Sequence, residues 1–215
     1  MLDAPPVARV ALGWGCGIGS ILALDALQRE KHDVVLVRVV PVPGSTRDVP
    51  DFVVQEQAAC LGLPLRIEQA VGEGETAALE RALAVVRADA IAFGYLRGED
   101  YLGLFKVASS TRRVGAEPLL PVRHLRPDDA AHRMVESGHR AFVRATRDDA
   151  ERAWLGRFLD APVIDEIEGT LGRSGWSLLR SLVVDGPLFQ RRLDAVAADA
   201  VRASDGWRLG LSLKG

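Results

Sequence analysis

The chain has 215 residues, of which 48% are hydrophobic and 26% are charged, a composition typical of one folded domain with or without a small appendage. Its 27 Lys and Arg residues are balanced by 29 Asp and Glu residues, so the charge gives no reason to expect a nucleic acid partner. Two cysteines cannot form a disulfide framework, and neither a signal peptide nor a membrane-spanning run is evident, so we expect no membrane association and a cytoplasmic location.

The first half of the chain alternates short apolar runs with helical patterns. The predicted strands are 7–12, 33–40, 65–69 and 90–93, and the predicted helices between them are 20–28, 51–61 and 76–87. This β-α-β-α-β-α-β order predicts an α/β fold, with a parallel sheet flanked by helices on both faces. Because ligands of such sheets bind at the carboxyl ends of the strands, we expect the site there.

The second half of the chain has a less regular pattern. We predict a helix at 99–114, a strand at 118–120, a helix at 128–137 and a strand at 140–145, and after Trp154 the spacing is interrupted by Gly, Pro and Trp. The change predicts an α/β domain at 1–116 and a smaller C-terminal α+β portion at 117–215.

The first predicted strand ends in a glycine-rich turn, Gly13-Trp-Gly-Cys-Gly-Ile-Gly-Ser20. One interpretation is a tight strand-to-helix turn that only packs. A dinucleotide site is excluded, because the G-x-G-x-x-G spacing fails and no acidic residue ends the second strand. A Walker P-loop is also excluded, because Gly-Lys-Ser/Thr is missing. The remaining interpretation is a turn that holds the phosphates of ATP, since glycines and a helix N-terminus present backbone N–H groups to anions.

The order of short motifs resembles the diphthine–ammonia ligase family, which belongs to the adenine-nucleotide α-hydrolase-like, or PP-loop ATP pyrophosphatase, group. The turn is similar to that family's Ser-Trp-Ser-Gly-Gly-Lys-Asp-Ser. Five further segments match in order, at 57–65, 92–100, 116–121, 154–160 and 184–189, with Ser137-Gly-His-Arg-Ala141 at the expected place between them. The resemblance covers residues from about 8 to 190. It implies a HUP-type fold and binding of ATP or AMP with Mg²⁺.

The resemblance also implies which residues form the site. The residues that correspond to the nucleotide-binding positions are Gly13, Trp14, Gly15, Cys16, Gly17, Ser20, Gly94 and Tyr95. Glu99 and Asp100 correspond to the family's acidic pair after the fourth strand and are the candidate catalytic residues, although acidic residues also favour any helix start. Cysteine and histidine spacing predicts no metal site held by the protein alone.

The chain departs from the family at the positions that carry charge. Ile18 stands at the lysine position and Gly19 at the aspartate position of the turn. The polar Gly-Glu-Asn-Gly-Glu-Phe-His-Thr stretch is replaced by Ser174-Gly-Trp-Ser-Leu-Leu-Arg-Ser181, and Tyr95 replaces an aspartate. Restoring Ile18→Lys and Gly19→Asp is expected to raise nucleotide affinity if the turn faces the site.

The remaining candidates have plainer explanations. Lys106, Arg112 and Arg113 either supply phosphate charge or form a solvated basic face. His32, His124, His132 and His139 are expected at turns and surfaces, and Ser174, Ser177 and Ser181 form no triad pattern. Cys16 is either a reactive thiol at a helix N-terminus or a small residue in a glycine-like position. Trp154, Trp176 and Trp207 indicate core, a hydrophobic substrate pocket or a homodimer surface.

Three functions remain open from the sequence, the third being a different reaction on the same fold, with an unrelated small molecule held by the apolar C-terminal part. In the first, the chain is an ATP-dependent, AMP-forming amide ligase, in which a small-molecule or protein carboxylate is adenylated and then attacked by ammonia. The retained Gly17, Ser20, Glu99 and Asp100 favour it. In the second, the chain is a catalytically degenerate relative that binds nucleotide or a partner without turnover, which Ile18 favours.

Overall fold

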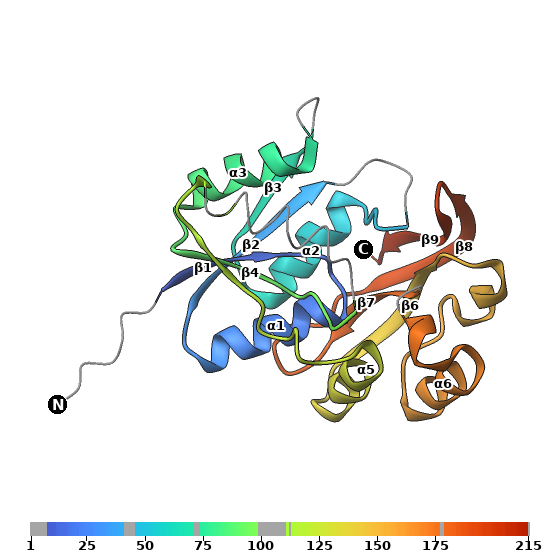
Figure 1. The fold of residues 1–215 in the computed structure, drawn as a ribbon. Helices are drawn as coiled ribbons and strands as arrows, with labels where there is room; N and C mark the ends of the chain where they lie inside the picture. The colour runs from blue at the N-terminus through green and yellow to red at the C-terminus, as the bar shows by residue number, and fades with distance from the viewer. Residues whose placement is uncertain are drawn as a thin grey trace.

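The computed structural model describes residues 8–40, 46–70, 74–98, 111, 113–176 and 179–214. The described strands form a parallel sheet in the order β3-β2-β1-β4-β5 and an antiparallel sheet in the order β7-β6-β9-β8 (Figure 1). The first order, with helices on both faces, is that of a doubly wound α/β sheet. The predicted fold class is confirmed.

The elements of the parallel part agree closely with the predicted ones. Their bounds are β1 Arg9–Gly13, α1 Ile18–Arg29, β2 Asp33–Val40, α2 Asp51–Leu61, β3 Leu65–Gln69, α3 Gly74–Val86, β4 Ala90–Phe93 and β5 Glu117–Leu119. Four of them, β2, α2, β3 and β4, have the predicted limits. Helix α1 begins two residues earlier than predicted, because the extended Gly17 is its N-cap and leaves Ile18 in the first turn. The helix predicted at 99–114 lies almost entirely outside the described residues.

Each central strand of the parallel sheet is apolar on both faces, because helices cover both (Figure 1). Val10 and Leu12 of β1 belong to one hydrophobic cluster with α1 and α2, whereas Ala11 packs in a second cluster with Leu79 and Leu83 of α3. The register pairs β1 in parallel with both β2 and β4. The carboxyl ends of these three strands therefore lie at one edge of the sheet, next to the start of α1.

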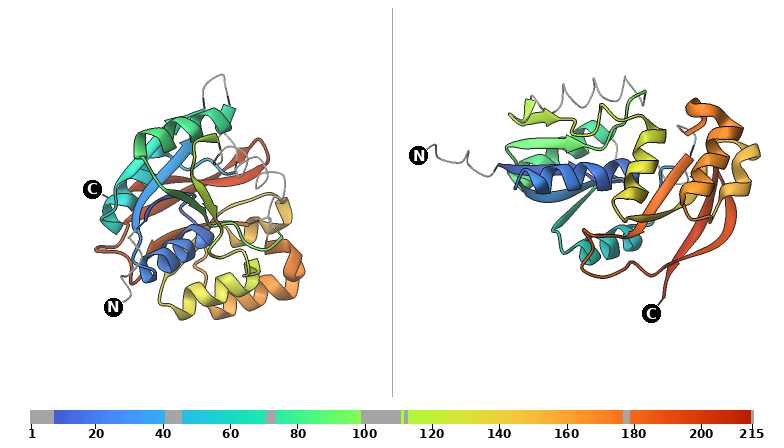
Figure 2. Two further views of the ribbon diagram at one scale, coloured as in Figure 1. Left: turned by 60° about the vertical axis from the view of Figure 1, so that its left-hand side comes forward. Right: turned by 90° about the horizontal axis from the view of Figure 1, so that it is seen from below.

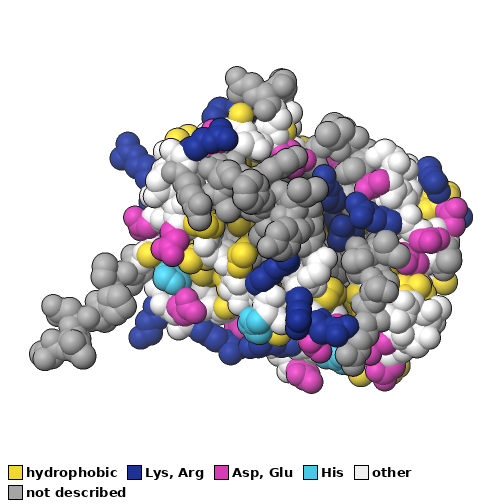
Figure 3. All heavy atoms as spheres, in the orientation of Figure 1, with side chains coloured by type: hydrophobic (Ala, Val, Ile, Leu, Met, Phe, Trp, Pro, Cys, Tyr) yellow, Lys and Arg dark blue, Asp and Glu magenta, His cyan; other side chains and the backbone are white. Residues whose placement is uncertain are grey.

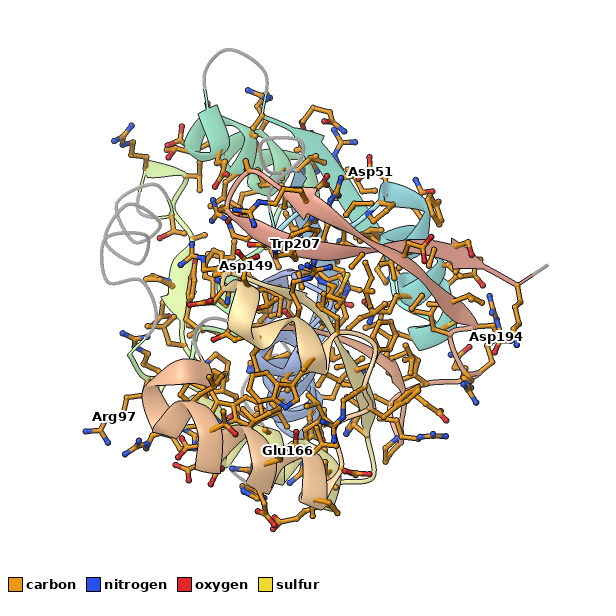
Figure 4. All side chains as sticks on the ribbon, turned by 90° about the vertical axis from the view of Figure 1, so that its right-hand side faces the viewer. Asp51, Arg97, Asp149, Glu166, Asp194 and Trp207 are labelled. Atoms are coloured by element: carbon orange, nitrogen blue, oxygen red, sulfur yellow. The ribbon has the colours of Figure 1, made fainter. Side chains whose placement is uncertain are left out.

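The C-terminal part contains more regular structure than the sequence pattern indicates. Its elements are α5 Pro127–Glu136, β6 Arg140–Thr146, the 3-10 helix η1 Asp149–Trp154, α6 Ala161–Gly175, β7 Leu179–Asp185, β8 Ala195–Ala203 and β9 Gly206–Leu213. Strand β6 pairs with β7 on one side and β9 on the other. Seen from below, the antiparallel sheet lies beside the parallel part (Figure 2). Trp207 of β9 donates its indole N–H to Asp149 of η1 (Figure 4).

One hydrophobic core joins the two parts. Helix α1 packs on β1, β2 and β4 and also contacts β7 and α5, and the cluster that contains Ile21 and Leu24 continues into Leu182 and Val183 of β7. Strand β5, three residues long, pairs with β4 in the parallel sheet. The predicted division of the chain into two domains at residue 116 stays a prediction. No helix within the described ranges has the length and apolar character needed to cross a bilayer.

Candidate functional site

A cavity of about 910 Å³ opens where the parallel and antiparallel sheets meet. The glycine turn between β1 and α1 forms part of its wall. From the parallel side, the described lining residues are Gly13, Trp14, Gly15, Gly17, Ile18, Gly19, Ser20, Val37, Val39, Arg47, Gly74, Glu75, Thr76, Leu79, Phe93, Gly94, Tyr95 and Leu96. From the C-terminal side they are Pro127, Val143, Arg144, Leu159, Trp176, Leu179, Arg180 and Ser181. The cavity thus lies at the strand ends where the sequence predicts the site.

Close packing explains why the turn is rich in glycine. A Cβ added to Gly13 would lie 2.6 Å from the Phe93 ring, and one added to Gly17 would lie 3.2 Å from Ser181 Oγ. At Gly19 a Cβ would lie 2.0 Å from the carbonyl oxygen of Gly94, so the backbones of α1 and of the segment after β4 touch directly. Close packing therefore accounts for the glycines at positions 13, 17 and 19 of the turn.

The same contact explains one departure from the diphthine–ammonia ligase motif. An aspartate at position 19 would place its Cβ inside the Gly94 backbone. The change would push α1 away from β4, so the paired substitution Ile18→Lys and Gly19→Asp would disturb the turn. Its effect on nucleotide affinity stays a prediction. Ile18, at the lysine position, lines the cavity and is 8% exposed.

Two backbone donors of the turn are bonded to serine hydroxyls, and two others have no acceptor among the described residues. The Gly15 amide donates to Ser20 Oγ at 3.0 Å, and the Ile18 amide donates to Ser181 Oγ at 3.2 Å. The amides of Gly19 and Ser20 have no acceptor in the described part of the chain, and the Gly17 N-cap makes no side-chain capping bond. These first-turn N–H groups, together with the positive end of the α1 dipole, are suited to an anion.

Trp14 and Cys16 are held in the protein interior. Trp14 is 3% exposed and donates its indole N–H to Gln57 Oε1 at 2.8 Å, while Gln57 Nε2 donates to the carbonyl oxygens of Val183 and Cys16. Cys16 has a φ of 63° and is fully buried. Its side chain is absent from the described cavity lining. Cys16 therefore occupies a glycine-like position and, with Gln57, fixes the turn against β7.

The C-terminal part supplies charged and apolar side chains to the cavity. Arg144 of β6 and Arg180 of β7, which sequence reasoning did not single out, line it. The buried Trp176 and Leu179 line it too, and Trp176 thus agrees with the interpretation as part of a hydrophobic pocket. The register of β6 and β7, which pairs Ala145 with Arg180, brings the two arginines to this place. Figure 3 shows Lys and Arg side chains gathered right of the centre, over the region between the end of β2 and β9.

Other predicted residues have the following positions. Gly94 and Tyr95 line the cavity, where the Tyr95 ring stacks on Phe93 with centroids 5.6 Å apart. Glu99 and Asp100, the candidate catalytic pair, lie outside the described residues, as do Lys106 and Arg112. Arg113 is exposed and pairs with Glu80 at 3.7 Å. The described ranges contain no group of three or more His, Cys, Asp or Glu residues that could hold a metal.

The tryptophans and histidines differ in their surroundings. Trp154 is core, whereas Trp176, which is 6% exposed, lines the cavity. His139 lies at the turn after α5, as expected, but it is 4% exposed, because its ring packs against Gly186 and contacts Ser137 Oγ at 3.0 Å. Burial lowers the pKa of His139. It lies away from the cavity and is a structural residue.

No protein-family model matches the chain, and no curated protein matches its sequence. One similar solved structure is a predicted subunit of tRNA methyltransferase from Methanocaldococcus jannaschii, with 14% identity, 86% of this chain and 100% of that chain covered, and a TM-score of 0.48. Another is the U34-tRNA thiolase NcsA from Methanococcus maripaludis with its [4Fe-4S] cluster. The match has 12% identity, covers 79% of this chain and 69% of that chain, and has a TM-score of 0.44.

Proposed function

We propose that this chain binds an adenine nucleotide in the cavity, with the phosphates at the N-terminus of α1. The observation that carries the proposal is the pair of open amides at Gly19 and Ser20, which belong to a turn that lines a cavity of about 910 Å³. That volume falls within the range of small-molecule sites. The cytoplasm remains the predicted location.

The two kinds of lining match the two parts of a nucleotide. Val37 and Val39 at the end of β2 and the Phe93 ring offer an apolar surface for the base. The turn offers N–H groups for the phosphates. For Mg²⁺ the described lining offers one carboxylate, Glu75, which lies 3.8 Å from Arg47. Glu75 and the phosphates themselves are thus the ligands that we propose for Mg²⁺ from this part of the chain.

The finer proposal is an AMP-forming amide ligase. A carboxylate oxygen would attack the α-phosphorus of ATP and release pyrophosphate, and ammonia would then attack the acyl carbon and release AMP. The segment at the family's acceptor stretch supports this idea, because Trp176, Leu179 and Arg180 from it line the same cavity. An apolar acid with its carboxylate near Arg180 suits this wall. Glu99 and Asp100 remain the proposed catalytic residues.

The competing proposal is nucleotide binding without turnover. It is favoured by the contact between Gly19 and Gly94, which leaves no space for a carboxylate in the turn. It is also favoured by Ile18, since a lysine there would stabilise charge on departing pyrophosphate and isoleucine cannot.

Titration calorimetry with ATP, AMP and adenosine, each with and without Mg²⁺, tests the binding proposal. We expect ATP to bind more tightly than adenosine, and Ser20→Ala to weaken ATP binding about 10-fold, because it removes a hydroxyl that holds the Gly15 amide. Ser137→Ala, which removes a hydroxyl remote from the cavity, is the control. No binding of any adenine nucleotide would contradict the proposal. Pyrophosphate release with carboxylic acids and ammonia then separates turnover from binding alone.

A further inference from the structure

The segment 46–50, which leads into α2, brings an exposed arginine to the cavity. Arg47 of this segment lines the cavity, and 55% of its side chain is exposed. Glu75, in the first turn of α3, lines the same cavity, and its carboxylate lies 3.8 Å from the Arg47 guanidinium. Two half-exposed groups of opposite charge, from different elements, therefore meet in the cavity wall.

The pair between Arg47 and Glu75 is suited to exchange. An ion pair of this length between half-exposed side chains contributes little to stability, because water screens both charges. Contacts between a guanidinium and a phosphate group are stronger, because two parallel N–H groups donate to charged oxygens. A phosphate ligand in the cavity would therefore compete well with Glu75 for the guanidinium.

The backbone around Arg47 is fixed by the antiparallel sheet. Arg144 of β6 donates to the carbonyl oxygens of Thr46 at 2.8 Å and of Arg47 and Asp48 at 3.4 Å. Arg208 of β9 pairs with the Asp48 carboxylate at 2.9 Å. Three consecutive residues are thus held by two strands of the C-terminal part, so the place of Arg47 depends on those strands.

Asp205, in the turn between β8 and β9, holds the same segment. Its carboxylate accepts the Thr46 amide at 2.5 Å and the Thr46 hydroxyl at 2.9 Å, and Thr46 is fully buried. Burial acts to raise the pKa of Asp205, but the hydrogen bonds from Thr46 and the nearby Arg147 outweigh it, so the pKa is lowered. The carboxylate is therefore ionised at neutral pH, and charge strengthens both of its hydrogen bonds.

Arg38 of β2 links this segment to the glycine turn. It is 6% exposed and donates to the carbonyl oxygen of Trp14 at 3.5 Å and to that of Arg47 at 3.4 Å. Because one guanidinium bridges the two carbonyl groups, the backbone of Arg47 lies close to the turn that leads into α1. The long side chain of Arg47 is thus within reach of a phosphate group at the N-terminus of α1.

We propose that Arg47 binds the phosphate oxygens of the nucleotide, that its pair with Glu75 is a resting contact of the free protein, and that Asp205 is a positioning residue for Arg47. This inference rests on the proposed function, because it assigns side chains to the phosphate end of that site. On binding, the guanidinium leaves Glu75 for the phosphates, and the carboxylate becomes available to Mg²⁺. The segment after β2 thereby supplies the positive charge that Ile18 does not supply.

Titration calorimetry with ATP, inorganic pyrophosphate and adenosine tests the Arg47 contact. Arg47→Gln is expected to weaken ATP and pyrophosphate binding roughly 10-fold and adenosine binding less than 2-fold, because adenosine has no phosphate. Arg113→Gln is the matched control. Arg113 is also exposed and also pairs with a glutamate of α3, Glu80, at 3.7 Å, but it lies outside the described cavity lining. This variant should change each affinity less than about 2-fold.

Glu75→Gln tests the exchange itself. Without Mg²⁺ it should tighten ATP binding about 2- to 3-fold, because Arg47 no longer has to leave a partner. With Mg²⁺ it should weaken ATP binding about 3-fold, because a carboxylate ligand is lost. The gain without Mg²⁺ should vanish when Arg47 is already Gln, and Glu80→Gln is the control. Effects of the same sign in both conditions, or a gain that persists without Arg47, would contradict the exchange.

Asp205→Asn tests the positioning role. We expect it to weaken ATP binding about 3- to 5-fold in the wild-type background and less than 2-fold when Arg47 is already Gln, since a positioning residue acts only through the residue that it positions. Asp199→Asn, at an exposed residue of β8 in the same hairpin, is the control. Circular dichroism and Tm verify folding, and Asp205→Glu, which keeps the charge, replaces Asp205→Asn if that variant unfolds.

The outcomes separate this inference from the proposed function. If Arg47→Gln binds ATP and pyrophosphate as the wild type does, the assignment of Arg47 is overturned and nucleotide binding stands. If pyrophosphate binds through Arg47 but ATP does not bind, the anion site stands and the nucleotide proposal is wrong. If the wild type binds neither, both are wrong. Equal losses for Asp205→Asn in the two backgrounds would overturn its positioning role.

Discussion

At the scale of single residues, Cys16 shows how position in the fold decides chemistry. A cysteine just before a helix N-terminus is a candidate for a reactive thiolate, because the helix dipole and nearby cations stabilise negative charge. In the structure burial outweighs these effects and raises the pKa of the Cys16 thiol to about 11, although Arg38 and Arg144 act in the opposite direction. Cys60 is buried too, and desolvation raises its pKa.

We therefore expect both thiols to be inert in the folded protein. With a pKa of about 11, roughly one Cys16 thiol in a thousand is ionised at pH 8. A disulfide reagent at pH 8 should label neither cysteine in the native protein and both in guanidinium chloride. A Cys60→Ala variant reports on Cys16 alone, and its rapid labelling in the native state would contradict the buried position.

At the scale of elements, the contact between the first turn of α1 and the end of β4 fixes the site. Gly19 and Gly94 meet backbone to backbone, so the turn, the helix start and Tyr95 keep their relative positions. The sequence indicates that the turn is glycine-rich. It does not indicate which glycine faces which neighbour, because Gly94 is 75 residues away along the chain and only the β1–β4 pairing brings the two together.

Gly19→Ala is expected to lower the free energy of unfolding by about 3 kcal/mol or more, because its Cβ would lie 2.0 Å from the Gly94 carbonyl oxygen. The control is Gly169→Ala on α6, where no atom lies within 4 Å of the added Cβ. That change should raise stability by about 0.5–1 kcal/mol, since alanine favours a helix. Urea denaturation measures both. A Gly19→Ala protein as stable as the wild type would disprove the close contact.

At the scale of the whole molecule, the sequence predicts the parallel part well and the antiparallel part poorly. Strands β2 and β4 are mostly buried, β3 is half-buried, and all three are bounded by turn residues, so local pattern and final structure agree. Strand β8 is rich in alanine, which has low strand propensity, and its conformation depends on pairing with β9. The sequence nevertheless contains two signals for C-terminal elements. Asp160 indicates the start of α6, where its carboxylate accepts the Val163 amide at 3.0 Å. The alternating Trp207, Leu209 and Leu211 indicate strand β9.

The residues of the candidate site likewise fall into those that the sequence predicts and those that it does not. The turn residues other than Cys16, and Gly94 with Tyr95, belong to local motifs and line one cavity, as the sequence predicts. Arg144 and Arg180 carry no local signal, because an arginine within a strand is usually a solvated residue. Their shared position results from the register of two strands and from the packing of β7 on α1, which single-sequence reasoning does not determine.

Amide hydrogen exchange with and without ATP tests the central claim, binding between the glycine turn and β7, most directly. The Gly19 and Ser20 amides lack acceptors in the described chain and should exchange quickly in the free protein. We predict that ATP slows exchange in peptides covering 14–21 and 179–184, while a peptide from α6 at 161–170 does not change. Bound ATP that leaves the first two peptides unprotected, or protects only the β8–β9 hairpin, would contradict the account.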